Sequence, residues 1–452
     1  MTDLYPFQGR GVDLLEKFKY RALLADEMGL GKSIQALFAA KRAGARPCVI
    51  VCPAGLKYHW EAEAALHCNL RAEVLNGTRP PKIRLVRPHP LVIINYDILG
   101  PWMKFLKKLD PIMVLADEVH FAKNPRAART KNLQYLCQGV EHVIGISGTP
   151  LTNRPAELWV ILNILWPEKF PSYTRFGFRY CKPSLEFGQI KFKGANRLPE
   201  LHKKLKKYGM IRRLKKDVLK DLPPKRRIVV PLPISDSREY LKAENDFAAW
   251  LRENFSGRRV RAALHAKRLV QFGYLKRLAA KLKMAAVHDW LDSFLEESDD
   301  KIIVFGIHRS IIGGLAERYA GKCVLVHGGV TGRARQRAYT QFRKSRRTRM
   351  FFGNDAAGTG WNGSCATVTA HIELPWTPGQ VNQAGDRMHR IGQLERTTEY
   401  FLVARKTVES RLCEILQTKQ GILNETLDGA PGGGTELNIF DQLTKLLIRG
   451  EK

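Results

Sequence analysis

The stretch LLADEMGLGKS at residues 23–33 decides the fold class of this chain. An apolar run from Arg21 to Ala25 predicts a short buried strand, and the helix-forming IQALFAA follows at residues 34–40. A strand, a glycine turn and a helix N-terminus together point backbone N–H groups at one place, which suits a polyphosphate. We therefore predict that this turn binds a nucleotide.

Individual residues of this turn have separate expected roles. Lys32 is expected to contact the β- and γ-phosphates of ATP, and the Ser33 hydroxyl to bind Mg²⁺. The backbone expected around the phosphates comprises Met28, Gly29, Leu30 and Gly31. The strict phosphate-loop pattern has a glycine where this chain has Asp26. Alone, the pattern fits a nucleotide loop and a plain glycine turn that caps a helix about equally.

Length and composition bound the class of protein. A chain of 452 residues with 44% hydrophobic residues should hold about two or three globular domains. No apolar run has membrane-spanning length, and the first ten residues lack the apolar segment of a signal peptide. The eight cysteines are scattered without a Cys-x-x-Cys pair. We interpret them as reduced residues of an intracellular protein, with neither disulfides nor a zinc site.

The charge predicts a polyanionic partner. The chain has 75 lysines and arginines against 43 aspartates and glutamates, a net charge of +32. The positive electrostatic field of such a chain favours binding to nucleic acid. A membrane surface is less favoured, since the sequence shows no basic amphipathic helix with an aromatic face. Residues 202–227 carry 12 basic and two acidic residues, and residues 257–283 carry nine basic and no acidic ones. We expect these runs, with residues 343–347, to contact DNA phosphates.

Two regions alternate between apolar strands and helices, separated by basic, helical sequence from about 155 to 300. The expected strands are 48–52, 91–95, 112–116 and 142–146 in the first region, and 302–305, 322–326, 349–353 and 366–372 in the second. Near-continuous apolar strands are typical of a parallel sheet covered by helices on both faces. The predicted fold class is therefore α/β, with functional groups at the carboxyl ends of the strands.

An acidic pair follows one of these strands. Asp117 is expected to hold Mg²⁺ while Glu118 polarises the attacking water. The alternative is a surface acidic turn that caps the next helix, which the upstream Lys32 and Ser33 make less favoured. Gln8 lies about 20 residues before the phosphate turn, where it could read an adenine edge or be an ordinary surface glutamine.

The chain has one phosphate turn, so we expect the second region to complete the site of the first. Residues 380–390 predict a helix with Gln383, Arg387 and Arg390 on one face, at i, i+4 and i+7. Two arginines on one face fit either a salt-bridged surface or arginine fingers directed at ATP.

Together these clusters resemble the Swi/Snf family of DNA-dependent ATPases within helicase superfamily two, from Tyr5 to about Leu427. The motifs stand in the family order: DEMGLGKS (26–33), CPAGLKYHW (52–60), DEVH with FAKN (117–124), SGTPLTNRPAELW (147–159), MIRRLKKDVLKDLPPK (210–225), VFGIHRS (304–310), GTGWN (358–362) and QAGDRMHRIGQ (383–393). The RRLKKDV and HRIGQ stretches are specific to this family rather than to helicases at large, and they disfavour an RNA helicase of the DEAH type.

The resemblance implies two RecA-like lobes with helical protrusions, ATP in the cleft between them and duplex DNA across both. The expected N-terminal lobe covers 1–232 with a protrusion at about 155–220. The expected C-terminal lobe covers 233–427 with a protrusion at about 235–298, followed by a glycine-rich joint and a helix at 428–452. The resemblance adds Gly358 to the nucleotide site. DNA contacts implied by it are Lys57, Lys123, Asn124, Thr149, Asn153, Arg154, Arg213, Arg309 and Trp361.

Three departures from the family pattern stand out. Val119 replaces the alanine of DEAH, and Ser33 replaces the commoner threonine but keeps its hydroxyl. Trp361 stands where a leucine is usual, and it either stacks on a sugar or fills core. No bromodomain, chromodomain, RING or zinc finger is present, so the chain is most similar to the compact annealing-helicase (HepA-related, fork-remodelling) branch and its bacterial or phage relatives.

The expected function is an ATP-driven translocase that remodels branched or paired DNA, acting as a monomer with ATP and Mg²⁺. The alternative is the motor subunit of a larger restriction, defence or nucleoprotein-remodelling complex, whose protein partner the sequence does not identify. A non-enzymatic DNA-binding protein would leave every catalytic motif without a role. The expected location is the cytoplasm of a bacterial or phage-infected cell, or the nucleus if the source is eukaryotic.

Overall fold

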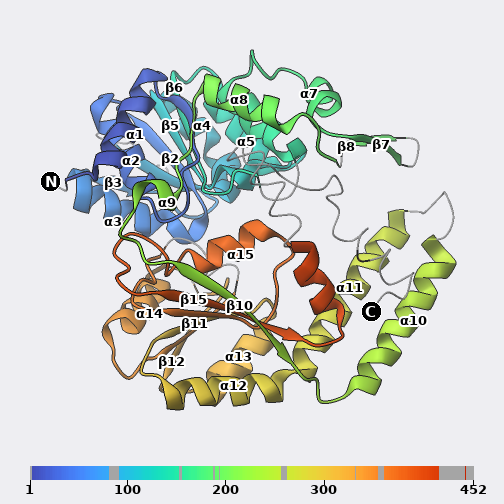
Figure 1. Ribbon diagram of the computed structural model, residues 1–452. Coiled ribbons are helices and arrows are strands. Elements are labelled where there is room, and N and C mark those ends of the chain that lie inside the picture. Colours follow the sequence, from blue (N-terminus) through green and yellow to red (C-terminus); the bar gives the residue numbers. More distant parts are fainter. Residues whose placement is uncertain are drawn as a thin grey trace. The chain divides into compact units, whose positions relative to one another are not determined.

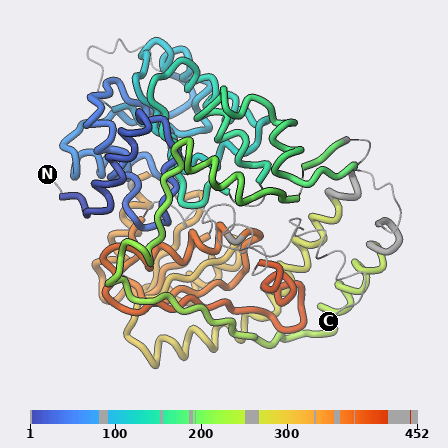
Figure 2. Tube along the Cα trace, turned by 45° about the horizontal axis from the view of Figure 1, so that its top comes forward, coloured from blue at the N-terminus to red at the C-terminus, as the bar shows by residue number. Residues whose placement is uncertain are grey.

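A computed structural model describes residues 3–80, 91–151, 155–186, 189–192, 194–255, 262–330, 332–354, 361–416 and 443 (Figure 1). Three predicted site residues, Asn153, Arg154 and Gly358, lie outside these ranges, as does the stretch 428–452 apart from Leu443. The chain divides into two compact units (Figure 2). Among the described residues, the first unit holds 3–182 and 194–222, and the second holds 183–192, 223–416 and 443.

Within the described residues of the first unit, seven parallel strands form one sheet in the order β3-β4-β2-β5-β6-β1-β9. Their bounds are β1 (Arg21–Leu24), β2 (Cys48–Cys52), β3 (Ala72–Val74), β4 (Leu91–Asn95), β5 (Met113–Asp117), β6 (His142–Ile146) and β9 (Met210–Ile211). β2, β4 and β5 are buried at every position, as their continuous apolar sequences require in a sheet with both faces covered.

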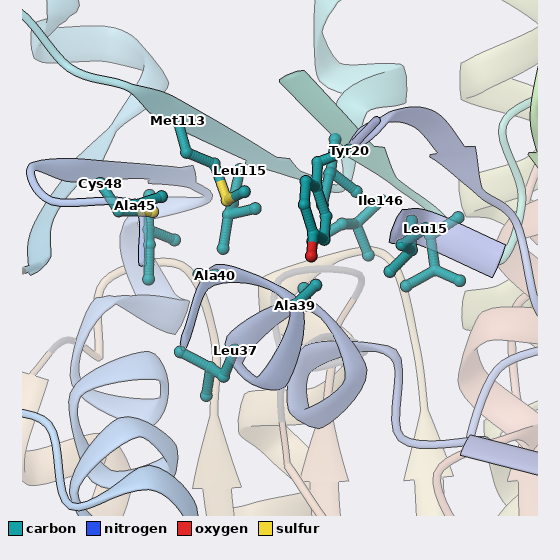
Figure 3. Close-up of a cluster of buried hydrophobic side chains, with 14 of the residues drawn as sticks. Leu15, Tyr20, Leu37, Ala39, Ala40, Ala45, Cys48, Met113, Leu115 and Ile146 are labelled. Atoms are coloured by element: carbon teal, nitrogen blue, oxygen red, sulfur yellow. The ribbon is translucent and has the colours of Figure 1, made fainter. Parts of the chain in front are cut away.

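The helices of the first unit are α1 (Pro6–Lys17), α2 (Lys32–Arg42), α3 (Lys57–Cys68), α4 (Leu99–Leu109), α5 (Ala128–Cys137), α6 (Leu158–Leu165), α7 (Tyr173–Tyr180), α8 (Leu198–Tyr208) and α9 (Lys215–Val218). Figure 3 shows how α2 is fixed: its Leu37 and Ala40 join the core cluster that also contains Met113 and Leu115 of β5 and Leu15 of α1. Because α2 packs firmly, the phosphate turn before it is held at a defined place.

Within the described residues of the second unit, six parallel strands form a sheet in the order β10-β15-β14-β11-β13-β12. The strands are β10 (Lys225–Leu232), β11 (Ile302–Phe305), β12 (Cys323–Val326), β13 (Met350–Gly353), β14 (Val368–His371) and β15 (Thr397–Ala404). The helices are α10 (Ser237–Phe255), α11 (Ala262–Leu282), α12 (Met284–Glu297), α13 (Arg309–Arg318), α14 (Gly332–Lys344) and α15 (Pro378–Gly385). These two parallel sheets confirm the predicted α/β class.

Several strands were not expected from the sequence. β3 and β9 are short, and β7 (Pro183–Glu186) and β8 (Gln189–Phe192) form a separate antiparallel pair in a region expected to be helical. β10 pairs with β15 in the second sheet, so the two units divide between Leu222 and Pro223, ahead of the boundary expected at 232. None of the helices in the described ranges combines the length and apolar character of a membrane span.

Candidate nucleotide site

The predicted strand–turn–helix is present in the first unit. β1 ends at Leu24, α2 begins at Lys32, and Gly29 and Gly31 lie between them with φ of 86° and 71°. Left-handed backbone of this kind favours glycine, which explains the two glycines. A Cβ atom on Gly31 would also lie 2.3 Å from the Gln8 side-chain nitrogen. The turn therefore keeps bare backbone at the helix N-terminus, as a phosphate site needs.

Asp26 explains the departure from the strict phosphate-loop pattern. Its side chain is fully buried and forms an ion pair with the Arg213 guanidinium. It also accepts hydrogen bonds from the Arg213 backbone N–H (3.0 Å), Arg213 Nε (2.9 Å) and Gln35 Nε2 (3.1 Å). The carboxylate thus ties the turn to the segment that follows β9. This contact corrects the expected DNA role of Arg213, whose guanidinium also lies 5.6 Å from the Phe7 ring centroid.

Gln8 lies on α1 and packs against this turn, so it is not an ordinary surface residue. It is 3% exposed, and its Nε2 donates to the Leu30 carbonyl at 3.2 Å. Its Oε1 accepts from the Tyr5 backbone N–H at 3.1 Å. The side chain is therefore held beside the phosphate turn by its own amide, and its contact with adenine stays a prediction.

Lys32 lies inside the turn. Its Nζ donates to the carbonyls of Asp26 (2.9 Å) and Glu27 (3.2 Å). Burial lowers the pKa of Lys32 to about 8, and the nearby charges of Glu118, Asp26 and Asp117 oppose this lowering. Two of these carboxylates, Asp117 and Glu118, are the acidic pair, so the sheet brings both predicted halves of the site together.

The Ser147-Gly148-Thr149 turn after β6 packs against the phosphate turn. A Cβ atom on Gly148 would lie 2.4 Å from Met28 Cγ and 3.1 Å from Lys32 Nζ. No larger residue fits at Gly148 without moving the loop. Three predicted motifs, which lie far apart in the sequence, therefore meet at the carboxyl ends of β1, β5 and β6.

The acidic pair occupies the end of β5. Trp60 Nε1 donates to Asp117 Oδ2 at 2.7 Å, and the Glu118 N–H donates to Asp117 Oδ1 at 2.9 Å. The Tyr96 hydroxyl donates to the Asp117 carbonyl at 2.7 Å. Burial and the charge of Glu118 raise the pKa of Asp117 to about 7. The carboxyl group is thus held by two donors in a site where its negative charge needs a cation.

His120 connects this pair with the Ser147 turn, a link that the sequence analysis missed. Its Nδ1 lies 3.3 Å from Glu118 Oε2 and 3.0 Å from Ser147 Oγ. Burial lowers the pKa of His120 to about 4, so the imidazole is neutral near pH 7. The histidine that ends the DEVH motif was the only sequence signal for this contact. The spacing of residues along the chain gives no reason for it to contact a serine that follows a different strand.

The donors in this site fit ATP and Mg²⁺. Ser33 is the second residue of α2, and Asp117 ends β5, so a hydroxyl and a carboxylate are available as oxygen ligands. Mg²⁺ prefers oxygen ligands and is usually bound by one or two carboxylates together with phosphate oxygens and water. The glycine backbone at Gly29 and Gly31 and the close approach of Gly148 to Lys32 Nζ are the second observation in favour of this fit.

In the second unit, the predicted helix at 380–390 is shorter than expected. α15 ends at Gly385, so Arg387 and Arg390 lie in the turns beyond it and do not share a helical face with Gln383. A Cβ atom on Gly385 would lie 2.3 Å from Glu399 Oε1, which leaves room only for glycine. Arg387 Nε donates to the Gln383 carbonyl and Arg390 Nη1 to the Trp361 carbonyl, each at 3.1 Å. Their role as arginine fingers stays a prediction.

A buried charge network supports this arginine segment. Glu399 is fully buried and contacts Arg227 Nε (2.8 Å) and His371 Nε2 (2.9 Å). Its pKa is about 2, because Lys225, His371 and Arg227 together outweigh the raising effect of burial. Lys225 also contacts Asp386 at 3.1 Å. β10 is thereby joined to the residue directly before Arg387.

Two of the expected DNA contacts are buried, which corrects those expectations. Lys57 is 7% exposed and donates to the Leu75 carbonyl (2.8 Å) and to Asn76 Oδ1 (2.6 Å). Trp361 is 4% exposed and stacks with Tyr339 and Phe351 at centroid distances of 4.9 and 4.4 Å. Trp361 therefore fills core, which was the alternative to stacking on a sugar.

The remaining candidates reach the surface to different degrees. The Lys123 side chain is 39% exposed and lies 3.6 Å from Glu157, while Asn124 is exposed and accepts from the Arg126 N–H. Thr149 is partly buried, and its N–H donates to Ser147 Oγ. Arg309 is exposed at the start of α13. Their contacts with DNA stay predictions.

The fold and the site define an α/β nucleotide-binding protein of the phosphate-loop class. The model of the SNF2-related domain matches residues 7–269, and that of the helicase conserved C-terminal domain matches residues 282–392. The chain therefore belongs to the SNF2-related family, and the resemblance inferred from its motifs is confirmed.

Relatives of the chain include vertebrate proteins as well as proteins of Caenorhabditis elegans and Mycoplasma pneumoniae. It is 31% identical over 448 residues to the DNA annealing helicase and endonuclease ZRANB3 of Bos taurus, covering 94% of this chain and 41% of that protein. It is 31% identical over 437 residues to the SWI/SNF-related matrix-associated actin-dependent regulator of chromatin subfamily A-like protein 1 of Xenopus tropicalis, covering 94% and 45%. The chain thus spans less than half the length of these relatives.

The chain is similar to a solved structure, the Sulfolobus solfataricus SWI2/SNF2 ATPase core in complex with dsDNA. The similarity covers 99% of this chain and 95% of the Sulfolobus chain. The TM-score is 0.46 and the sequence identity is 22%.

Proposed function

We propose that the chain is a DNA-dependent ATPase that moves along duplex DNA and remodels branched DNA by branch migration, fork regression or strand annealing. The observation that carries this proposal is the meeting of Lys32 with Asp117 and Glu118 at one edge of the first sheet. Membership of the SNF2-related family supports it, as does the similarity to the Bos taurus protein named as a DNA annealing helicase. The net charge of +32 supports a nucleic acid as the partner.

In the proposed reaction, the N–H groups of the phosphate turn and Lys32 bind the phosphates of ATP. Ser33 and Asp117 would hold Mg²⁺, which neutralises negative charge on the phosphates when it is bound. Glu118 orients the attacking water and accepts its proton. The neutral His120 lies beside both groups, with its Nδ1 3.3 Å from Glu118 Oε2 and 3.0 Å from Ser147 Oγ.

Duplex and branched DNA are the proposed partners, contacted through phosphates without reading of bases. Exposed lysines on α8 support this kind of contact: Lys203, Lys206 and Lys207. Phosphate contacts give affinity and register but carry no sequence information. We further propose that the protein acts as a monomer. Its proposed location is the cytoplasm of a bacterial or phage-infected cell, or the nucleus of a eukaryotic cell.

The test is ATP hydrolysis by the purified chain with no DNA and with duplex, single-stranded or forked DNA of equal nucleotide content. We expect duplex and forked DNA to stimulate turnover most. Lys32→Ala serves as the inactive control, which excludes a contaminating ATPase. Hydrolysis that is indifferent to DNA, or stimulated by single strands alone, would contradict the proposal.

A further inference from the structure

The outer face of α11 in the second unit carries cations and exposed apolar groups in one line. Lys267, Val270, Tyr274, Arg277 and Lys281 are spaced by three or four residues, which places them on one side of the helix. All five are exposed, Tyr274 to 51% and Val270 to 69%. We call these five residues the outer stripe of α11. It extends over about 21 Å, given a rise of about 1.5 Å per residue.

The opposite face of α11 fixes the helix to its own unit. Phe272 and Leu275 join a buried core cluster. Two buried lysines add polar anchors: Lys276 donates to the Leu374 carbonyl, and Lys283 donates to the Leu402 carbonyl at 2.6 Å and pairs with Glu409. The helix is therefore held by its inner face, and the charges of the outer stripe are additional to those that anchor it.

A glycine beside Tyr274 has no packing explanation. Gly273 lies in the middle of α11, where glycine destabilises a helix relative to alanine. A Cβ atom at this position would meet no atom within 4 Å. On a helix surface, Gly273 is the neighbour of Val270 and Arg277, at i−3 and i+4. The missing side chain leaves the helix surface open at Gly273, between Val270 and Arg277, and we call this opening the Gly273 gap.

The chemistry of the outer stripe fits a strand whose bases are not paired. The charged residues of the outer stripe, Lys267, Arg277 and Lys281, are all cations, so the partner should be a polyanion. Proteins that bind single strands combine a positive track for phosphates with aromatic rings on which bases stack. In a duplex the bases are already stacked on one another, so an exposed tyrosine on a straight helix gains little from it. A protein partner would favour an apolar centre with fewer cations.

We propose that the outer stripe of α11 binds single-stranded DNA, with a base stacked on Tyr274 over the Gly273 gap and phosphates on Arg277 and Lys281. This inference rests on the proposed function, because remodelling of a fork or junction exposes unpaired strands. The stripe would bind such a strand on the second unit, separately from the ATP-binding residues of the first. Lys267, whose ammonium lies 5.0 Å from the Trp250 ring centroid, extends the positive track at the other end.

The experiment measures binding of a labelled oligothymidine and of a labelled duplex of the same length to the full chain by fluorescence anisotropy. Tyr274→Ala should weaken binding of the single strand roughly 5- to 100-fold, the range of base–aromatic stacking. Gly273→Ala should weaken it while raising thermal stability, because it favours the helix but fills the gap. Tyr135→Ala is the matched control, since Tyr135 is an exposed tyrosine (54%) on α5 of the first unit.

Charge variants separate phosphate contacts from stacking. Arg277→Glu and Lys281→Glu should each reduce the salt slope of log K for the single strand by about 0.7 or more. Tyr274→Ala should leave that slope unchanged. Arg238→Glu, an exposed arginine at the start of α10, is the charge control. Figure 1 shows α10 beside α11.

The proposal is overturned if Tyr274→Ala weakens binding of the single strand no more than Tyr135→Ala does, which is the result expected for a surface that binds protein. It is also overturned if the variants weaken binding of the single strand and binding of the duplex equally, which is the result expected for a general phosphate-binding surface. These failures differ from a failure of the proposed function, in which the unaltered chain would show no stimulation of ATP hydrolysis by DNA.

Discussion

Asp26 and Arg213 form a buried ion pair that joins the phosphate turn to the segment after β9, across nearly 190 residues of sequence. Asp26 is fully buried, and it receives donors from both the side chain and the backbone of Arg213. A strict phosphate loop has glycine at this position, and here that glycine is replaced by a residue whose ion pair anchors the loop to the segment after β9.

The first prediction concerns this pair. Asp26→Asn leaves the Arg213 guanidinium without its counter-charge, which should cost roughly 3–5 kcal/mol and lower the melting temperature of the first unit by on the order of 10 °C. Asp13→Asn is the matched control, because Asp13 and Arg42 form an ion pair of exposed side chains. Exposed pairs contribute less than about 1 kcal/mol. Equal melting temperatures for the two variants, measured by calorimetry, would contradict the structural role of Asp26.

The second prediction separates nucleotide binding from hydrolysis. Lys32→Ala should weaken ATP binding, because a buried ammonium beside the phosphates is lost. Glu118→Gln should retain ATP but stop turnover, because it removes only the carboxylate that accepts the proton from water. Binding of a fluorescent ATP analogue and single-turnover hydrolysis measure the two steps. If Glu118→Gln hydrolyses ATP at the normal rate, the base has been misassigned.

The sequence was sufficient to predict the sheets and the nucleotide-binding edge, because both depend on local patterns. Continuous apolar runs marked β2, β4, β5 and β11 within a residue, and the polar residues after β1, β5 and β6 marked the site. Strands of two or three residues such as β9 give no such pattern. β10 was missed because it begins with three basic residues and only its last residue, Leu232, is buried, so it is not a continuous buried apolar run.

Long-range contacts were not predictable in the same way. The sequence offered no reason for Asp26 to meet Arg213, or for His120 to meet Ser147, since each pair is brought together only by the finished sheet. The end of α15 could have been predicted from the sequence. The residue spacing favoured a helix through Arg390, but Gly385 is a residue type at which helices commonly end. Trp361 shows the limit of a motif, because a residue in a functional position can still be core.

The third prediction tests the arginines of the second unit. Arg387→Ala and Arg390→Ala should each reduce turnover by on the order of 10³-fold, the usual loss for an arginine finger. Nucleotide affinity should change far less, because the phosphate turn is intact. Arg405→Ala, an exposed arginine after β15, is the control. A change in turnover of only a few-fold, with a normal melting temperature, would rule out the arginine-finger role.

The fourth prediction follows from the low pKa of Glu399. The folded pKa, about 2, lies below the ordinary value of 4.5, so this carboxylate stabilises the second unit above about pH 4.5 and loses its contribution as the pH falls toward 2. A shift of this size corresponds to about 3 kcal/mol. Glu399→Gln should therefore lower the melting temperature strongly at pH 7 and progressively less below pH 4.5. A difference that stays constant between pH 7 and pH 3 would show that the charge of Glu399 is not the source of the stability.

We predict that the chain remodels branched DNA rather than unwinding plain duplex. When a motor on duplex DNA moves a junction, each base pair broken ahead is replaced by one formed behind, so the net cost of pairing is near zero. Unwinding a linear duplex costs about 1.4 kcal/mol per base-pair step without compensation.

The most direct measurement compares ATP-dependent strand separation of a four-way junction or fork with that of a linear duplex of matched arm length, using Glu118→Gln as the inactive control. We predict fast processing of the branched substrate and little separation of the linear duplex. Fast separation of the linear duplex, with the junction processed no faster, would contradict the account and identify an ordinary helicase.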